Sequence, residues 1–480
     1  MSVRKPVQVQ NSKPSSRPKR TYPVKKKKEK QRSRSPHWFL IGLGLSGIAM
    51  LSATAGAFLA ITLGSTNAIN NDRTASDDDP EFSREEITNT PPLQLPKLKQ
   101  PVNLLVLGTK VLSSDLGESP RELGYHRLVH DSFDGATDAM FLVRFDPEAD
   151  KVTMLSIPRD SKVDLPGHGT VKINAANRYG GAGASARAVS NLLGGVEIDR
   201  YIRVNVQGVE QLVDALGGVD MYVPKDMRYR DDSQRLYIDL EQGEQTLDGE
   251  EAMQFIRFRQ DEYGDIGRVQ RQQLLLRAMV QQALNPSTLT RIPNILSVIR
   301  SNLDTNLGNK EMLALARFAS NRDDENLEML MLPGEFEDVV ENRNGRRITT
   351  SYWLPHNRRI EQMMARHFDV ESNRLSSSSS DEVSPRIRIA IQDSTDNSEA
   401  VRGVARDLED DGFRNVYVAS DWSQPLETTR IVAQTGNVEA AKAVAEVLGV
   451  GEVRVESTGA LDSVVSIQLG EDWWEKQESE

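Results

Sequence analysis

The sequence predicts an α/β protein in which helices enclose a central β-sheet. Segments with strand-like and helix-like patterns alternate between residues 102 and 285, and they alternate again after residue 385. The chain has 480 residues, of which 38% are hydrophobic, so it is long enough and apolar enough for two or more domains. We therefore expect a large α/β sandwich followed by a small α/β domain.

The N-terminal segments predict a membrane anchor. Residues 1–37 contain 13 Lys and Arg against one Glu, and the next 27 residues, 38–64, contain no charge. As a helix these would extend about 40 Å, enough to cross a hydrocarbon core of about 30 Å. A cleaved signal peptide has a shorter apolar region, so we expect an uncleaved, single-pass transmembrane helix.

The charge on either side of this segment predicts its orientation. The positive-inside rule places a disordered basic tail, 1–37, in the cytoplasm and the bulk of the chain beyond the plasma membrane. Residues 65–480 hold 46 basic and 69 acidic residues. The basic tail is expected to contact the anionic lipid bilayer, which explains its charge without nucleic acid.

Two further segments are predicted to be linkers. Residues 65–100 are polar and then proline-rich, and residues 371–384 are serine-rich. They separate a large unit, 101–370, from a small one, 385–471.

The large unit is expected to alternate strands and helices. Apolar, β-rich runs predict strands at 102–108, 139–146, 151–158, 201–208 and 219–224. Helical spacing, ended twice by Gly-Gly, predicts helices at 184–193, 209–216 and 269–284. In the small unit the same patterns predict the order strand, helix, strand, strand, helix, strand, strand.

Several classes of catalytic site are excluded by composition and motifs. The chain has no Cys, which excludes a thiolate nucleophile and Cys-ligated metals, and its few His, 6 in all, argue against an all-His metal site. It contains no Gly-x-Ser-x-Gly, P-loop, Gly-x-Gly-x-x-Gly or His-Glu-x-x-His motif.

Arginines form the most distinctive cluster. Arg159 follows the predicted strand 151–158, and a second group lies within sixteen residues, comprising Arg257, Arg259, Arg268, Arg271 and Gln272. Strand alternation in Ile256–Arg259 would place Arg257 and Arg259 on one face, and Arg268 and Gln272 lie one helical turn apart. Such a cluster suits a polyanion, since guanidinium pairs bidentately with phosphate. The alternative is a set of solvated salt bridges with Asp261, Glu262 and Asp265.

Several strings, in this order, resemble the LytR–CpsA–Psr family of bacterial wall-polymer ligases. They span 102–285 and include VNLLVLG, DGATDAMFLVRFDP, SIPRD followed by KINAA, LDGEEAMQFIRFR and DIGRVQRQQ. Residues 385–471 resemble the LytR C-terminal domain that often follows, through IAIQDSTDNSEAV and TTRIVAQTGN. The resemblance implies an α/β/α sandwich with a central mixed sheet over 101–370.

The resemblance also implies an activity. Members of this family are membrane-anchored phosphotransferases that move a glycopolymer from an undecaprenyl-(pyro)phosphate carrier to peptidoglycan. By position, Arg159, Arg257, Arg259, Arg268 and Gln272 match residues that hold the lipid pyrophosphate, with Arg159 and Arg257 expected to be catalytic. Asp138 matches a catalytic Asp that binds Mg²⁺ (or Mn²⁺), and such an ion would be recruited together with the substrate.

Two departures from the family pattern leave an alternative open. Ala136 stands where the family usually has Arg, and Lys110 stands where it has Asp. A second metal carboxylate would then come from elsewhere, such as Asp115 or Asp134. These substitutions favour the alternative of a non-catalytic scaffold or regulatory protein that binds polyprenyl phosphate or the wall.

Overall fold

The computed structural model describes residues 82, 85, 87–89, 96–110, 133–232, 236–258, 264–320, 326–343, 346–370, 385–395 and 397–479. The chain divides into two compact units, Met1–Asp72 and Arg73–Glu480, and all the described residues belong to the second. Within these ranges, no helix is both long enough and apolar enough to span a bilayer. The tail 1–37, the predicted anchor 38–64 and the linker 371–384 lie outside them, as does most of the linker 65–100.

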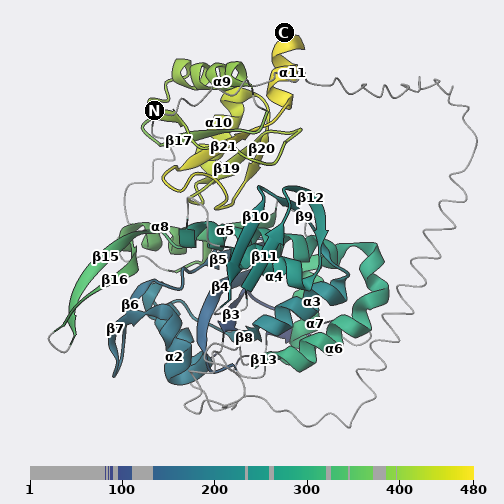
Figure 1. Ribbon diagram of the computed structural model, residues 1–480, viewed down its shortest axis with the longest axis vertical. Coiled ribbons are helices and arrows are strands. Elements are labelled where there is room, and N and C mark those ends of the chain that lie inside the picture. Colours follow the sequence, from purple (N-terminus) through teal and green to yellow (C-terminus); the bar gives the residue numbers. More distant parts are fainter. Residues whose placement is uncertain are drawn as a thin grey trace, which may run out of the picture. The chain divides into compact units, whose positions relative to one another are not determined.

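A six-stranded mixed sheet forms the centre of the large domain (Figure 1). Its strands, in spatial order, are β13 (Leu303–Thr305), β8 (Arg200–Asn205), β3 (Val102–Lys110), β4 (Ala136–Asp146), β5 (Lys151–Ser156) and β14 (Leu327–Met331). The pairs β3–β8 and β5–β14 are parallel, whereas β3–β4, β4–β5 and β8–β13 are antiparallel. This order confirms the predicted central mixed sheet.

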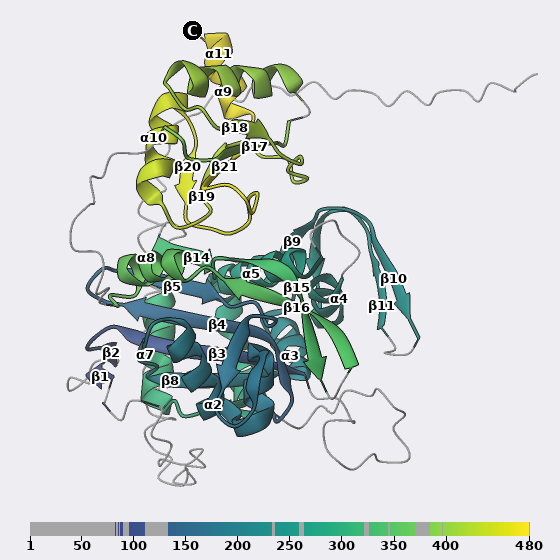
Figure 2. The same ribbon diagram turned by 90° about the vertical axis from the view of Figure 1, so that its left-hand side faces the viewer.

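Helices cover both faces of this sheet (Figure 2). They are α2 (Ala176–Leu192), α3 (Val206–Leu216), α5 (Gly264–Leu284), α6 (Ile292–Asn302), α7 (Asn309–Ser320) and α8 (Asn357–His367). Strand alternation sends Leu105 into a core shared with Val189 of α2 and Met364 of α8. It sends Leu104 to the opposite face, where it packs with Phe318 of α7. The predicted α/β/α sandwich is therefore present.

A separate apolar cluster joins small strands to two of these helices. The strands are β9 (Val219–Val223), β10 (Met227–Asp231), β11 (Leu236–Leu240) and β12 (Gly243–Leu247), and α4 (Gly249–Arg257) follows them. Phe255 of α4 is fully buried in this cluster with Val213 of α3 and Leu275 of α5. Any side chain at Gly249 would meet the backbone carbonyl of Glu210, so glycine is required where α4 crosses α3.

Further short elements complete the large domain. They are β1 (Thr88–Asn89), β2 (Lys97–Leu98), β6 (Lys162–Leu165), β7 (Gly169–Lys172), β15 (Gly334–Arg343), β16 (Arg346–Pro355) and the 3₁₀ turns η2 (Ile173–Ala175) and η3 (Pro286–Arg291). The pairs β6–β7 and β15–β16 are antiparallel hairpins.

The small domain has a five-stranded sheet of order β18-β17-β21-β19-β20. Its elements are β17 (Ile389–Asp393), α9 (Ser398–Asp410), β18 (Val416–Val418), β19 (Arg430–Ala433), α10 (Val438–Leu448), β20 (Glu452–Arg454), β21 (Val465–Leu469) and α11 (Asp472–Ser479). The order predicted up to β21 is confirmed, and α11 is additional.

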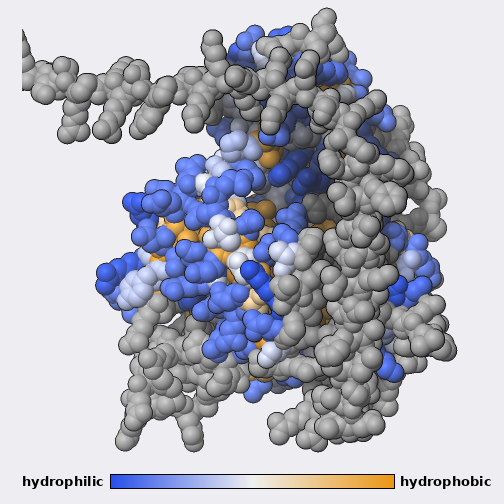
Figure 3. All heavy atoms as spheres, turned by 90° about the vertical axis from the view of Figure 1, so that its right-hand side faces the viewer, coloured by the Kyte–Doolittle hydropathy of each residue, from blue (hydrophilic) through white to orange (hydrophobic). Residues whose placement is uncertain are grey.

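Figure 3 shows that mostly hydrophilic residues cover one face of the molecule, with a hydrophobic area among them.

The strand predicted at Ile256–Arg259 is wrong at Ile256 and Arg257, and Arg259 lies outside the described residues. Residues 249–257 form α4, which begins with a capping box: Asp248 accepts a hydrogen bond from the Glu251 backbone N–H, and the Glu251 side chain accepts one from the Asp248 N–H. This cap stabilises a helix whose apolar face is buried, so helix formation overrides the strand-like alternation. The prediction at 201–208 is half right, since β8 ends at Asn205 and α3 begins at the next residue.

Candidate functional site

The candidate site is built around Asp138 on β4. One carboxylate oxygen of Asp138 lies 2.8 Å from the Arg159 guanidinium. The Asp138 side chain is 32% exposed and the Arg159 side chain 18% exposed. The pair is therefore partly shielded from water but open to a ligand. The charge-assisted hydrogen bond to Asp138 fixes the orientation of the Arg159 guanidinium.

Arg159 follows β5 in a loop that other bonds hold in place. Its backbone carbonyl accepts a hydrogen bond from Asn174 N–H at 3.1 Å. The neighbouring Asp160 carboxylate lies 3.8 Å from Arg159 Nε and 3.1 Å from Lys172 Nζ at the end of β7. The β6–β7 hairpin thus places Lys172 beside the predicted site, a contribution that the sequence analysis missed although Lys172 begins the quoted KINAA string.

Helix α5 supplies the other predicted polar groups. Gln272 Nε2 lies 3.5 Å from the Asp138 backbone carbonyl, a long hydrogen bond that brings α5 against β4. Arg268 is one turn earlier on the same helix and is only 4% exposed. Arg268 and Gln272 therefore lie on one face of a helix, as predicted. The helix itself, α5, begins at Gly264, which is before the predicted start at residue 269.

The remaining arginines connect to the site less directly. Arg257 is the last residue of α4, and the carbonyl of the next residue, Phe258, accepts a hydrogen bond from the Arg271 guanidinium. Arg271 also lies 5.8 Å from the centre of the Phe258 ring. Arg259 lies outside the described residues. The structure thus groups Asp138, Arg159 and Gln272, with Arg268 one turn before Gln272 on α5.

Comparison with known proteins identifies the family. A model described as the LytR_cpsA_psr family matches residues 61–369, and one described as the LytR cell envelope-related transcriptional attenuator matches residues 386–473. The chain belongs to the LytR–CpsA–Psr family. This confirms the resemblance found in the sequence.

Named relatives support an enzymatic role. The chain is 32% identical over 325 residues to the polyisoprenyl-teichoic acid–peptidoglycan teichoic acid transferase TagU of Oceanobacillus iheyensis, covering 66% of this chain and 90% of the relative. It is 35% identical over 207 residues to the corresponding transferase TagV of Bacillus subtilis, covering 42% and 52%. The crystal structure of B. subtilis TagV is similar over 57% of this chain and 99% of that chain, with 28% identity and a TM-score of 0.46. The relatives named as transferases confirm the prediction that this LytR–CpsA–Psr protein is an enzyme.

The two departures from the family pattern form a single register pair. In the antiparallel pairing of β3 with β4, Lys110 lies opposite Ala136, after a bulge between Gly108 and Thr109. Ala136 is two residues before Asp138 on the same strand. The departures are therefore local to the Asp138 end of β4 rather than spread over the domain.

A second polar cluster, which the sequence analysis missed, surrounds Arg203 on β8. Its guanidinium lies 2.6 Å from Asp304, 3.3 Å from Asn177 Oδ1 and 3.8 Å from Asp134. Asp134, one of the two alternative metal carboxylates, is thus an ion-pair partner of Arg203. The other, Asp115, lies outside the described residues. All three partners are far from Arg203 in sequence, so no local motif could indicate the cluster.

The residues around Asp138 fit a divalent ion only together with a ligand. Among the described residues, no three or more His, Asp or Glu side chains are grouped as a metal site. One accessible carboxylate, Asp138, is available beside Arg159. Mg²⁺ is commonly bound by one or two carboxylates together with substrate phosphates and water. The geometry therefore suits a Mg²⁺ ion that arrives with a phosphate group.

Proposed function

We propose that this chain is a membrane-anchored phosphotransferase that moves a glycopolymer from an undecaprenyl-(pyro)phosphate carrier to peptidoglycan. The observation that carries the proposal is the Asp138–Arg159 pair at 2.8 Å, with α5 placing Gln272 against the same strand. The names of the related transferases support the class of reaction, because they pair a polyisoprenyl-linked teichoic acid with peptidoglycan. The membrane anchor is the uncharged segment 38–64.

In this proposal the cationic side chains hold the two phosphates of the carrier. Arg159, oriented by Asp138, and Arg268, on the first turns of α5, bind phosphate oxygens, and Gln272 donates a further hydrogen bond. Arg257 and Arg259 complete the phosphate site from the end of α4 and the residues that follow. Phosphoryl transfer depends mainly on positioning and charge neutralisation, which these groups supply.

The bond changes follow from the donor. The oxygen of an acceptor hydroxyl on peptidoglycan forms a bond to the phosphorus that carries the glycopolymer, and that phosphorus loses its bond to the bridging oxygen. Undecaprenyl phosphate leaves with the electron pair, and the hydroxyl proton leaves to water. Mg²⁺ (or Mn²⁺), held by Asp138 and phosphate oxygens, would neutralise charge on the phosphates. Arg159 keeps its position through Asp138.

The central test is binding of a polyprenyl phosphate by the full chain in detergent. Removing one charge-assisted hydrogen bond costs about 1.5–3 kcal/mol, so Arg159→Ala should weaken binding by about tenfold or more. Arg228→Ala is a matched control, because the Arg228 side chain is 66% exposed and forms ion pairs with Asp226 and Asp239 near the β10–β11 hairpin. Equal affinity in the wild type and a folded Arg159→Ala variant would refute the phosphate site.

A second candidate function is a non-catalytic scaffold that binds the same lipid. The register pair of Lys110 with Ala136, in place of the family's Asp and Arg, favours it. Incubating the wild type with lipid-linked glycopolymer and peptidoglycan separates the two. Covalent attachment of glycopolymer supports the transferase, whereas tight lipid binding without any attachment supports the scaffold.

A further inference from the structure

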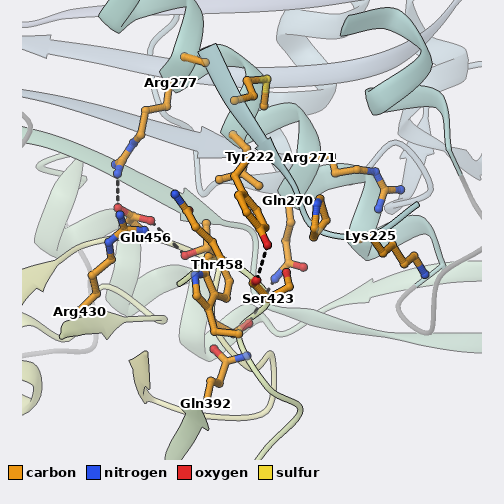
Figure 4. A pocket seen from close by; sticks show the side chains of 18 of the residues that line it. Tyr222, Lys225, Gln270, Arg271, Arg277, Gln392, Ser423, Arg430, Glu456 and Thr458 are labelled. Atoms are coloured by element: carbon orange, nitrogen blue, oxygen red, sulfur yellow. Dashed lines mark hydrogen bonds and ion pairs between the residues drawn. The ribbon is translucent and has the colours of Figure 1, made fainter. Parts of the chain in front are cut away.

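A cavity of about 510 Å³ lies where the segment 61–369 meets the segment 386–473 (Figure 4). Helix α5 and strand β9 line it from the first segment. The loop 420–424, strands β19 and β20 and residues 456–459 line it from the second. This volume is within the range of about 300–1,000 Å³ typical of small-ligand sites.

Hydrogen bonds between the two segments fix the walls of this cavity. Gln270 Nε2 donates to the backbone carbonyls of Ser457 and Gly459 at 3.0 and 3.2 Å. The Tyr222 hydroxyl donates to the Ser423 carbonyl at 2.7 Å, and Figure 4 shows this contact across the cavity. Because each wall is bonded to the other, the cavity is a formed site rather than a loose gap.

Positive charge predominates in the lining. Its cationic residues are Lys225, Arg271, Arg277, Arg430 and Arg454, and its carboxylates are Asp220, Asp421 and Glu456. Glu456 forms an ion pair with Arg277 and lies 3.9 Å from Arg454. Burial lowers the pKa of Arg430, and the like charges of Arg454 and Arg277 lower it further. One carboxylate is thus shared by several guanidiniums, an arrangement that a bound anion would stabilise.

Neutral polar and aromatic groups also face the cavity. Gln392 is 5% exposed, and its amide oxygen has no hydrogen-bond partner in the described structure. Figure 4 shows the Gln392 amide directed into the cavity. The indole N–H of Trp422 is also buried, and no described residue accepts a hydrogen bond from it. Amides, aromatic rings and guanidiniums together are suited to a ligand with both hydroxyl and acidic groups, such as an anionic sugar.

Helix α5 connects this cavity to the Asp138 site. Gln270, Leu274, Arg277 and Gln281 are spaced by four, three and four residues and form one stripe facing the cavity. Gln272, two residues from Gln270, points about 200° away and contacts Asp138. Gly267 also lines the cavity, so the lining reaches the N-terminal end of α5, where Arg268 is the next residue. A polymer with its phosphate at Asp138 could therefore continue around this end into the cavity.

We propose that the cavity binds an anionic segment of the glycopolymer, a sugar or polyol phosphate, so that the C-terminal domain contributes directly to recognition of the donor. This inference rests on the proposed function in taking the donor polymer as the ligand. It assigns a role to the segment 386–473, which carries none of the predicted phosphate residues.

The test measures binding of lipid-free oligomers to the full-length protein by calorimetry. The probes are a glycerol phosphate oligomer, an uncharged maltooligosaccharide and inorganic phosphate. We expect the wild type to bind the glycerol phosphate oligomer more tightly than either other probe, with affinity falling as salt rises. Arg430→Gln should weaken that binding by about tenfold. Lys225→Gln, at an exposed position on the opposite wall, should weaken it too and provides a second variant if Arg430→Gln does not fold.

Arg402→Gln is the matched control, since Arg402 is exposed on α9 and does not line the cavity. Equal affinity for the charged and uncharged oligomers, no binding of any oligomer, or binding of inorganic phosphate alone would each overturn the proposal. Polyprenyl phosphate binding measured on the same variants separates the two proposals. Arg430→Gln should leave polyprenyl phosphate binding unchanged. If the proposed phosphate site at Asp138 is wrong, Arg159→Ala will not weaken polyprenyl phosphate binding, but the oligomer affinities will still support the cavity.

Discussion

Glu328 on β14 provides a quantitative test of the electrostatics that hold the large domain together. Its carboxylate lies 2.8 Å from Lys151 Nζ, 2.9 Å from Thr153 Oγ1 and 2.9 Å from His367 Nδ1, and its side chain is only 4% exposed. His367 ends α8, and its other ring nitrogen lies 3.3 Å from the Gly436 carbonyl in the small domain. One carboxylate thus connects the edge of the central sheet, α8 and the small domain.

The pKa of Glu328 gives the sign and size of its contribution. Burial alone would raise this pKa, but hydrogen bonds from His367 and Lys151 and their charges outweigh burial and lower it from 4.5 to about 2. A group whose pKa is lower in the folded state stabilises the fold above its unfolded pKa, and this stabilisation is lost as pH falls. The two pKa values correspond to about 3 kcal/mol, fully present above about pH 5 and lost between about pH 4.5 and 2.

The perturbation is Glu328→Gln, with urea unfolding followed by tryptophan fluorescence at pH 7, 5, 4 and 3. We expect the variant to be less stable by up to about 3 kcal/mol at pH 7, and the difference from the wild type to shrink as pH falls. Glu446→Gln, at an exposed position on α10, is the control and should follow the wild type throughout. A difference in the free energy of unfolding between the wild type and Glu328→Gln that stays constant from pH 7 to pH 3 would refute the reasoning.

Three further predictions follow from the anchor, the cap and the metal. A reporter active only outside the membrane should be active when fused after residue 480, and a cytoplasmic result would contradict the anchored transferase. Asp248→Ala should lower the free energy of unfolding by about 1 kcal/mol, because the N-cap hydrogen bond to Glu251 N–H is lost; unchanged chemical denaturation would refute this role. Titration calorimetry should show little Mg²⁺ binding by the free protein and clear binding once a pyrophosphate is present. Transfer should be lost in Asp138→Ala, and transfer that continues with a chelator would remove the ion from the mechanism.

The central sheet could be predicted because its strands carry their own signal. The runs at Val102–Lys110 and Ala136–Asp146 are apolar on both faces, as expected for strands covered by helices on each side. Glycines after the helical patterns also marked helix ends correctly: Gly217 has a left-handed φ of 88° and ends α3. In these segments local pattern and tertiary environment favour the same structure.

The α4 error shows where local pattern is insufficient. The sequence of Ile256–Arg259 alternates as in a strand, yet Asp248 and Glu251 form a capping box that was visible in the sequence as Asp-x-x-Glu. Weighing the cap above the alternation would have predicted the helix and placed Arg257 at its last turn. The ion pair of Arg277 with Glu456 could not be predicted in this way, since the two residues are 179 positions apart and neither has a local signature.

The position of the two family departures bears on the choice between transferase and scaffold. Lys110 and Ala136 are partners in one strand register, two residues from Asp138. The family's Asp and Arg at these positions carry no net charge as a pair, whereas Lys and Ala carry one positive charge. The exchange therefore adds positive charge at the end of the sheet where a phosphate is proposed to bind, while Asp138 and Arg159 keep their ion pair. We therefore propose that the exchange alters the balance between ion and protein charge at the proposed site, and the attachment assay with lipid-linked glycopolymer decides whether that site is catalytic.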